Sequence, residues 1–272
     1  MQISRWIGKY RPIKLLGRGD FSEVYLAEDP HLQTQVAIKV LNPHANSNVH
    51  RLFNESIRTM ARMDHAHIIS VHDFGEQNNA PFCVMAYAAC GSIRQWLQDV
   101  KSMPLKSMVT YVKQIAKALQ YAHDLNIVHQ RLKPENILLD EEGSVLLSDF
   151  GPTEIRGSLL PSLSPSALRY MAPEQIMGRA QALSDQYVLG LIIYEWLMGA
   201  PPFTGAPTEV FEQQMKGTPA SLREKIPALS SLLEEVVMIA LSKDPKNRFA
   251  RINSFAFAFE QAARESLSNP GI

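Results

Sequence analysis

The spacing of apolar and polar residues predicts strands in the first third of the chain. Short runs there are rich in β-branched and aromatic residues, which favour strands. They cover residues 10–16, 23–27, 35–41, 68–74 and 82–87. One helix is predicted over residues 49–63, and a turn over residues 75–81 separates the last two strands. This part of the chain is therefore predicted to be a sheet with one helix.

After Gly91 the apolar spacing changes to that of helices. Apolar residues recur three and four positions apart at 109, 112, 115, 116, 119 and 122, which predicts a helix with one buried face. Residues 187–198 are apolar on almost every side, which predicts a helix buried all round. The predicted fold class is α+β, with a small β-rich lobe over residues 1–88, a larger helical lobe over residues 89–265 and a polar tail over residues 266–272.

Composition and charge narrow the classes of partner. The 272 residues are 46% hydrophobic and 20% charged, which is typical of a folded globular protein. Because 27 basic residues balance 27 acidic ones, no strong field attracts nucleic acid or an anionic membrane, and neither is an expected partner. Two cysteines, Cys83 and Cys90, are too few for a disulfide framework or a zinc site.

Targeting and membrane signals are not expected in this sequence. Residues 1–16 lack the apolar stretch of a signal peptide. Residues 187–198, the most apolar stretch, contain Glu195 and are shorter than the ~18 residues of a membrane span. The sequence therefore predicts a cytoplasmic chain, or the cytoplasmic part of a longer one, with no membrane segment inside it.

Several motifs suited to binding phosphate follow one another along the chain. Gly17 and Gly19 form a turn between two predicted strands, where backbone N–H groups can approach a ligand closely. Such turns are common, and alone this one has little specificity. Lys39 stands in an apolar strand, where its ammonium needs an anionic partner. Three further motifs follow in order, namely Asn136, Asp149-Phe150-Gly151 and Ala172-Pro173-Glu174.

In this order and spacing the chain resembles the eukaryotic-type (Hanks-type) Ser/Thr protein kinases, bacterial members especially. The resemblance extends from residue 10 to about residue 259, and Asp185 and Arg248 match the helices of the larger lobe. It implies a two-lobed protein-kinase fold with ATP and Mg²⁺ as cofactors. Lys39 would hold the α- and β-phosphates, and Asn136 and Asp149 would hold the metal.

The resemblance alone assigns a further set of residues to the nucleotide. Two glycines would cover the phosphates, apolar residues would enclose the adenine, and Met85 would be the gatekeeper before a hinge over residues 86–88. The set consists of Gly17, Gly19, Val24, Ala37, Met85, Tyr87, Ala88 and Leu138. For its apolar members, ordinary core packing is the competing explanation.

The catalytic loop departs from the family pattern. Active kinases have His-Arg-Asp-Leu-Lys-Pro-Glu-Asn, whereas residues 129–136 here are His-Gln-Arg-Leu-Lys-Pro-Glu-Asn. Arg131 thus stands at the general-base position, and a guanidinium, which stays protonated, is predicted to be non-functional there. Lys133 keeps its expected place. Gln130 replaces the arginine that in many relatives binds a phosphorylated activation loop, so activation by that route is not expected.

Two more departures concern the partners of these groups. An ungapped alignment places Ser56 where the glutamate partner of Lys39 belongs, with Glu55 next to it. Either the helix is rotated or shifted, or Lys39 turns to Asp149 instead. Ala167 replaces the threonine that would bind the catalytic aspartate.

These departures favour a pseudokinase that binds nucleotide, protein partners or both in signalling, with severely impaired phosphotransfer. The alternative is an active Ser/Thr kinase with an unusual mechanism. A small-molecule phosphotransferase is disfavoured by residues 172–174 and by Arg248. Arg131 could pair with Asp149 and compete with the metal, or lie against the γ-phosphate and permit binding with little metal. Serines 158, 162, 164 and 166 are either phosphorylation sites or plain loop residues.

Overall fold

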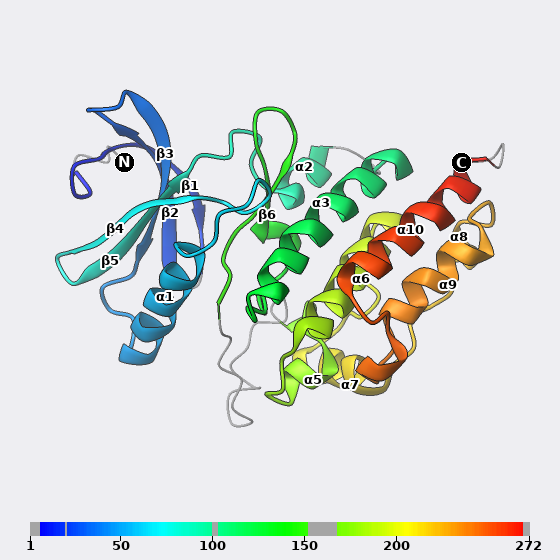
Figure 1. The fold of residues 1–272 in the computed structure, drawn as a ribbon. Coiled ribbons are helices and arrows are strands. Elements are labelled where there is room, and N and C mark those ends of the chain that lie inside the picture. Colours follow the sequence, from blue (N-terminus) through cyan, green and yellow to red (C-terminus); the bar gives the residue numbers. More distant parts are fainter. Residues whose placement is uncertain (1–5, 20, 100–102, 152–167, 269–272) are drawn as a thin grey trace.

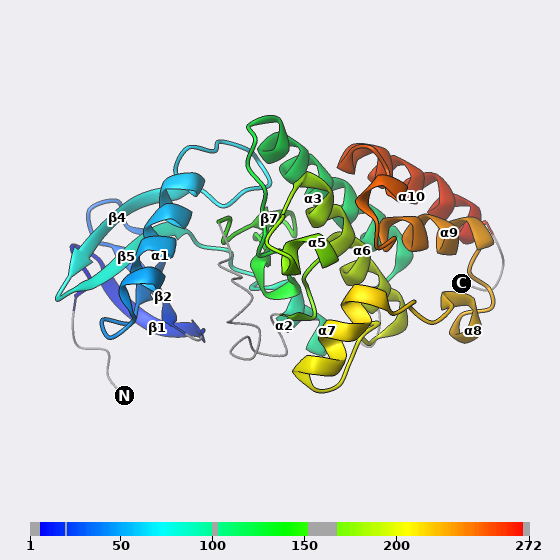
Figure 2. The same ribbon diagram turned by 90° about the horizontal axis from the view of Figure 1, so that it is seen from below.

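The computed structural model describes residues 6–19, 21–99, 103–151 and 168–268, which form a small β-rich lobe and a larger helical lobe (Figure 1). The small lobe has five antiparallel strands in the order β1-β2-β3-β5-β4. They are β1 (Arg11–Arg18), β2 (Ser22–Asp29), β3 (Thr34–Leu41), β4 (Val71–Gln77) and β5 (Ala80–Ala86). Helix α1 (Ser47–Met60) lies beside this sheet, as the view from below shows (Figure 2).

Both faces of the sheet are covered, because alternate residues of a strand point to opposite sides. On β3, Val36 and Ile38 belong to a small cluster with Tyr10 and Phe82. Leu41 belongs instead to the main core, together with the apolar stripe of α1. The buried apolar residues of that stripe are Leu52, Phe53, Ile57 and Met60.

Several predicted boundaries in the small lobe differ from the structure. The helix predicted over residues 49–63 ends at Met60, and the strand predicted over residues 68–74 begins at Val71. The turn predicted over residues 75–81 is confined to Asn78 and Asn79, whose φ angles are +54° and +61°. A two-residue hairpin turn of type I′ needs positive φ at both positions, and asparagine tolerates this better than most residues, so both strands extend further than predicted.

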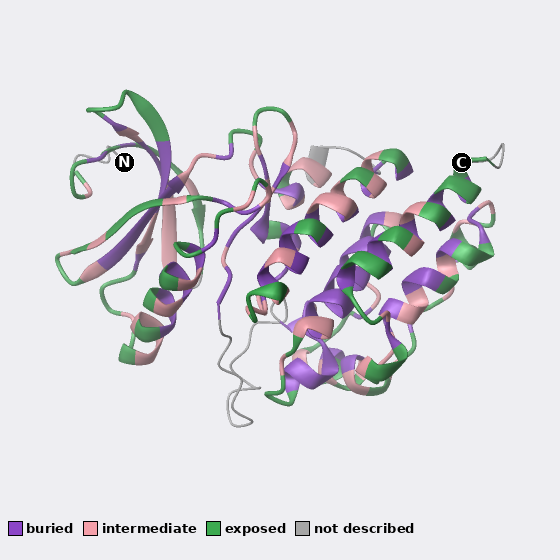
Figure 3. Ribbon diagram, in the orientation of Figure 1, coloured by how far each residue is buried: buried purple, intermediate pink, exposed green. Residues whose placement is uncertain are grey.

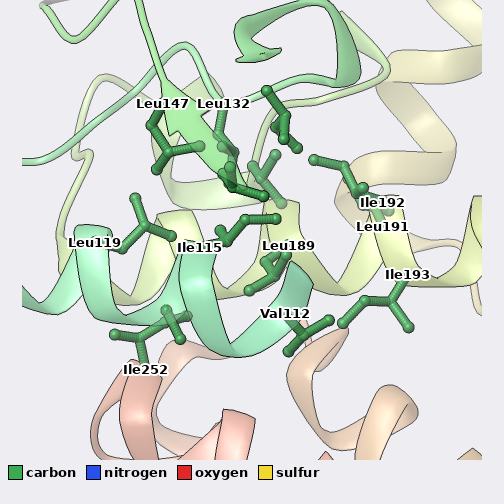
Figure 4. Packing of buried hydrophobic residues seen from close by; sticks show 14 of the residues in the cluster. Val112, Ile115, Leu119, Leu132, Leu147, Leu189, Leu191, Ile192, Ile193 and Ile252 are labelled. Atoms are coloured by element: carbon green, nitrogen blue, oxygen red, sulfur yellow. The ribbon is translucent and has the colours of Figure 1, made fainter. Parts of the chain in front are cut away.

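The larger lobe packs its helices around one central helix, α6 (Ala182–Met198), which is buried on every side from Ser184 to Trp196 (Figures 3 and 4). Close packing of α6 is possible because Gly190 has no Cβ, and a Cβ built there would lie 3.2 Å from the Cβ of Ala240. The other elements are α2 (Ile93–Asp99), α3 (Leu105–Asp124), η1 (Pro134–Asn136), β6 (Ile137–Leu139), β7 (Val145–Leu147), α5 (Pro173–Ile176), α7 (Pro207–Lys216), α8 (Leu222–Lys225), α9 (Ser231–Ala240), η3 (Pro245–Asn247) and α10 (Ile252–Leu267). Of the helices described, none is both long and apolar enough to cross a bilayer.

The last helix continues further than the sequence predicts. A polar tail is expected over residues 266–272, but α10 ends only at Leu267. Ser266 is completely buried, and its Oγ accepts a hydrogen bond of 2.9 Å from the backbone N–H of Ser230. The hydroxyl of Ser266 thus links α10 to the start of α9. The polarity of serine alone does not predict that this residue is buried between two helices.

A buried ion pair joins α5 to the segment before α10. Arg248 contacts both carboxylate oxygens of Glu174, at 2.7 and 2.9 Å. The guanidinium is fully buried and also donates to the backbone carbonyls of Leu183, Ser242 and Lys243. A buried charge of this kind is stable only while its partner and its hydrogen bonds are complete.

We therefore expect Arg248→Ala to lower the free energy of unfolding by about 3–5 kcal/mol, because it leaves Glu174 buried without a partner. Urea denaturation measures this change. The matched control is Arg251→Ala, which removes an exposed pair with Asp124 and should cost no more than about 1 kcal/mol. Equal losses in the two variants would contradict a structural role for the buried pair.

Candidate functional site

A cavity of about 550 Å³ lies between the two lobes. The first three strands, the connection between the lobes, β6 and the residues just after β7 all contribute to its walls. Ten of the residues that the sequence assigns to a site line it, namely Gly17, Val24, Ala37, Lys39, Met85, Tyr87, Ala88, Asn136, Leu138 and Asp149. Residues from the strands of the small lobe, from the connection between the lobes and from the loop after β7 thus line one cavity, although they are far apart in the sequence.

Three assigned residues are not among those that line this cavity. Gly19 lies at a separate cavity of about 570 Å³, next to Trp6 and Phe21. Its backbone N–H donates to the carbonyl of Ser22 at 2.8 Å, so this N–H is committed within the turn. Arg131 and Lys133 lie outside the walls as well, but both act on Asp149 through their charges.

The sequence did not assign several residues of the cavity wall. Ile69 lies in the stretch before β4 and lines the cavity. Its backbone N–H donates to the carbonyl of Leu147 in the larger lobe at 2.9 Å, a tertiary contact that the sequence does not show. Ser148 could have been found from its position next to Asp149. The others are Lys14, Leu16, Arg18, Ala89, Gly91, Ser92, Arg94, Gln95 and Glu135, whereas Ala86 of the expected hinge and Cys90 just beyond it do line the cavity.

Lys39 and Asp149 form an ion pair across the cavity, from β3 to the segment that follows β7. Both side chains are largely buried. Burial alone would raise the pKa of Asp149, but the charge of Lys39, followed by those of Arg131 and Lys133, lowers this pKa to about 2. Asp149 is therefore an ionised carboxylate that is paired with Lys39 and also stabilised by the charges of Arg131 and Lys133.

The structure decides between Glu55 and Ser56 as the residue of α1 that faces the site. Glu55 points to solvent and pairs with Arg51 at 2.8 Å. Ser56 is buried, and its hydroxyl donates to the backbone carbonyl of Phe150. Gly151 packs directly against it, since a Cβ on this glycine would lie 2.9 Å from the Cβ of Ser56. Helix α1 thus presents a short hydroxyl here and no carboxylate for Lys39.

The catalytic-loop segment, residues 129–136, is fixed by a buried acid in α6. Asp185 accepts hydrogen bonds from the backbone N–H groups of His129 and Gln130, at 2.9 and 3.1 Å. The imidazole of His129 is stacked on Phe150, with 4.1 Å between the ring centroids. Complete burial lowers the pKa of His129, so this ring is neutral and acts in packing.

Arg131, at the position that the resemblance assigns to the general base, is anchored through its backbone. Its N–H donates to the carbonyl of His129 at 2.8 Å, and its own carbonyl accepts from the side-chain amide of Asn136 at 2.7 Å. The side chain at this place is a guanidinium, which cannot accept a proton. Among the residues described, no group of three or more histidines, cysteines, aspartates or glutamates is gathered that could hold a metal.

The site fits a nucleotide better than it fits Mg²⁺. Apolar side chains enclose one part of the cavity, and Lys39 stands in the other part. A divalent cation prefers several oxygen ligands, commonly carboxylates. Among the described residues of the wall, Glu135 is paired with Arg94 and Asn136 offers an amide oxygen, and the other carboxylate, Asp149, is already paired with Lys39. Arg131 and Lys133 add positive charge beside that carboxylate, which opposes binding of a further cation.

A second charged cluster borders the cavity at Arg94. This arginine contacts Glu135 at 3.0 Å and Glu195 at 2.7 Å, and it also bonds the hydroxyl of Tyr170. These contacts connect helix α2 to η1 and to α6, and they hold Glu135, the residue next to Asn136. The sequence shows no signal for this cluster, because its members lie in four separate segments.

Some residues of interest lie outside the described part of the chain. They are Ala167 and the serines at 158, 162, 164 and 166. The predictions made for them remain predictions.

Comparison with known proteins agrees with this geometry. The family model for the protein kinase domain matches residues 10–262. The serine/threonine-protein kinase PrkC of Bacillus subtilis is 31% identical over 249 residues, which are 89% of this chain and 38% of that protein. PknF of Mycobacterium tuberculosis, also a serine/threonine-protein kinase, is 33% identical over 260 residues, 90% of this chain and 54% of PknF. The chain spans only about half or less of the length of these relatives. Its two-lobed fold, the cavity between the lobes and these matches show that the chain belongs to the eukaryotic-type (Hanks-type) serine/threonine protein kinase family.

Proposed function

We propose that this protein-kinase domain is a pseudokinase, which binds nucleotide, protein partners or both in signalling and transfers phosphate poorly or not at all. The observation that carries the proposal is Arg131 at the general-base position. A substrate hydroxyl there would meet a fixed cation in place of a proton acceptor. Loss of a general base costs typically ~10²–10⁴-fold in rate, so severe impairment is expected even where nucleotide binds.

Nucleotide binding is supported by the cavity itself. Val24, Ala37 and Leu138 give it apolar walls suited to a purine, and Lys39 stands where phosphates would lie. Two anchors of the scaffold that holds these groups are present, since Asp185 and Arg248 make the contacts described above. A chain that keeps this scaffold and lacks the base is suited to binding and conformational signalling. We place it in the cytoplasm, or in the cytoplasmic part of a longer chain, where ATP is present.

An active kinase with an unusual mechanism is the second candidate function. It is favoured by the retention of Lys39, Lys133, Asn136 and Asp149, because phosphoryl transfer depends mainly on positioning and charge. The two candidates differ in whether the unaltered chain transfers phosphate at a useful rate.

We expect the wild-type chain, given ATP, Mg²⁺ and a generic protein substrate, to transfer no more phosphate than Asp149→Ala does. Incorporation of radioactive phosphate measures this directly. Transfer by the wild type that Asp149→Ala abolishes would overturn the pseudokinase proposal and establish the active kinase.

Restoring the aspartate is expected to recover little activity by itself. In Arg131→Asp, Lys39 still has Asp149 as its partner, so recovery should fall well short of the ~10²–10⁴-fold that a general base supplies. Adding Ser56→Glu gives Lys39 a second carboxylate, and the double variant should recover more. The matched control adds Ser56→Gln, which has the same size and no charge. Equal recovery in the single variant and both doubles would contradict the role assigned to position 56.

The two cysteines provide a test of where a nucleotide lies. Cys90 is exposed and lines the cavity, whereas Cys83 is buried, and burial raises the pKa of its thiol to about 12. We expect iodoacetamide to modify Cys90 alone in the folded chain, and ATP to slow this reaction, as followed by peptide mass spectrometry. Reaction of Cys83 after denaturation is the control. An unchanged rate at Cys90 under conditions where ATP demonstrably binds would place the nucleotide elsewhere.

A further inference from the structure

We propose that the small lobe contains a second ligand site, which binds an uncharged aromatic molecule on the face of the sheet opposite the nucleotide cavity. The site is the cavity of about 570 Å³ at which Gly19 lies. This size is within the range of ligand pockets in proteins, roughly 300–1,000 Å³. The inference does not depend on the proposed nucleotide binding.

The register of the strands separates the two cavities. Glu23 lies opposite Val40 on the neighbouring strand, and Val40 lies opposite Phe82. Residues opposite one another in antiparallel strands share a face of the sheet, and these three line the second cavity. Val24 and Lys39, one position along their strands, point to the other face and line the nucleotide cavity. The sheet therefore stands between the two cavities.

Two exposed aromatic rings line the second cavity. Trp6 is 49% exposed and Phe21 is 52% exposed. The carbonyl of Trp6 accepts a hydrogen bond of 3.0 Å from the side-chain amide of Gln77. The carbonyl of Phe21 accepts one of 2.8 Å from the backbone N–H of Asn42. Both rings thus stand on an anchored backbone, and a molecule in the cavity would bury their apolar surface at little cost in ordering the chain.

The chemistry of the walls favours an aromatic ligand. Besides the two exposed rings, Tyr25 and Phe82 line the cavity. Val40 and Pro43 add aliphatic surface. Aromatic rings pack on one another offset or edge to face, and they gain free energy beyond that of the buried area. A site with rings of Trp, Tyr and Phe in its walls therefore binds an aromatic molecule more readily than an aliphatic chain.

The charged groups of this cavity compensate one another. Arg18 and Glu23 are the only Lys, Arg, Asp or Glu residues among the described residues that line it. They pair at 2.9 Å, and Glu23 also accepts a hydrogen bond from the hydroxyl of Tyr25. A charged ligand would have to break this pair to gain a counter-charge, so the site suits an uncharged one. Because Arg18 lines the nucleotide cavity as well, one turn of the chain borders both sites.

The test titrates the intact chain with two fluorescent probes of the same ring system. N-phenylnaphthylamine is uncharged, whereas anilinonaphthalene sulfonate has the same rings and an anionic group. We expect the uncharged probe to bind more tightly than the sulfonate. Tighter binding of the sulfonate would overturn the assignment of an uncharged ligand.

Three variants show where the uncharged probe binds. Trp6→Ala and Phe21→Ala should each weaken its binding by about tenfold, because each removes a ring from the wall. Ala80→Trp fills the cavity from a position that lines it and should abolish binding. The matched control is Phe74→Ala, which removes an exposed ring of the same sheet that is not among the lining residues, and it should change nothing. A probe held in the nucleotide cavity would be indifferent to all of these changes, and that result would overturn the proposal.

Two other occupants of the cavity would give different results. If a second copy of the chain covered this face, the wild type would sediment as a dimer and Phe21→Ala as a monomer. If residues 1–5, which precede Trp6, filled the cavity, a chain without them would bind the uncharged probe more tightly. Either result would overturn the proposal. We expect sedimentation to be the same in wild type and Phe21→Ala, and probe binding to be unchanged by removal of residues 1–5.

Discussion

The ion pair between Lys39 and Asp149 joins the two lobes across the cavity, and the character of the site follows from it. An ammonium inside an apolar strand needs an anion, because an unpaired buried charge is very costly. In this chain Ser56 offers none, so Lys39 takes the carboxylate that follows β7. The negative charge of Asp149 is thereby balanced by the ammonium of Lys39.

The substitution at position 131 acts on the same carboxylate from the other side. An aspartate there would have added negative charge near Asp149, whereas Arg131 adds positive charge. Ser56 and Arg131 are 75 positions apart in the sequence. Both departures nevertheless leave more positive charge around Asp149 than the family pattern would.

The framework around the site has none of these departures. Asp185 holds the backbone of residues 129 and 130, and Arg248 with Glu174 fixes the larger lobe. These contacts involve backbone groups and fully buried charges, whose removal would destabilise the fold. The cluster at Arg94 adds a tie between α2, η1 and α6 next to the cavity. The chain has thus kept the interactions that position the catalytic segment, and its departures from the family pattern within the site are at positions such as 56 and 131.

The sequence by itself determined the α+β class, the buried helix α6, the order of the motifs and the presence of a guanidinium at position 131, because these depend on residue type and local spacing. The tertiary structure alone decided which partner Lys39 takes, 110 positions away, and that Ser56 rather than Glu55 faces the site. It also placed Gly19 at another cavity and confined the turn between β4 and β5 to the two asparagines, Asn78 and Asn79. These features depend on how a helix is rotated and on which distant segments meet, and the periodicity of one segment contains no information about either.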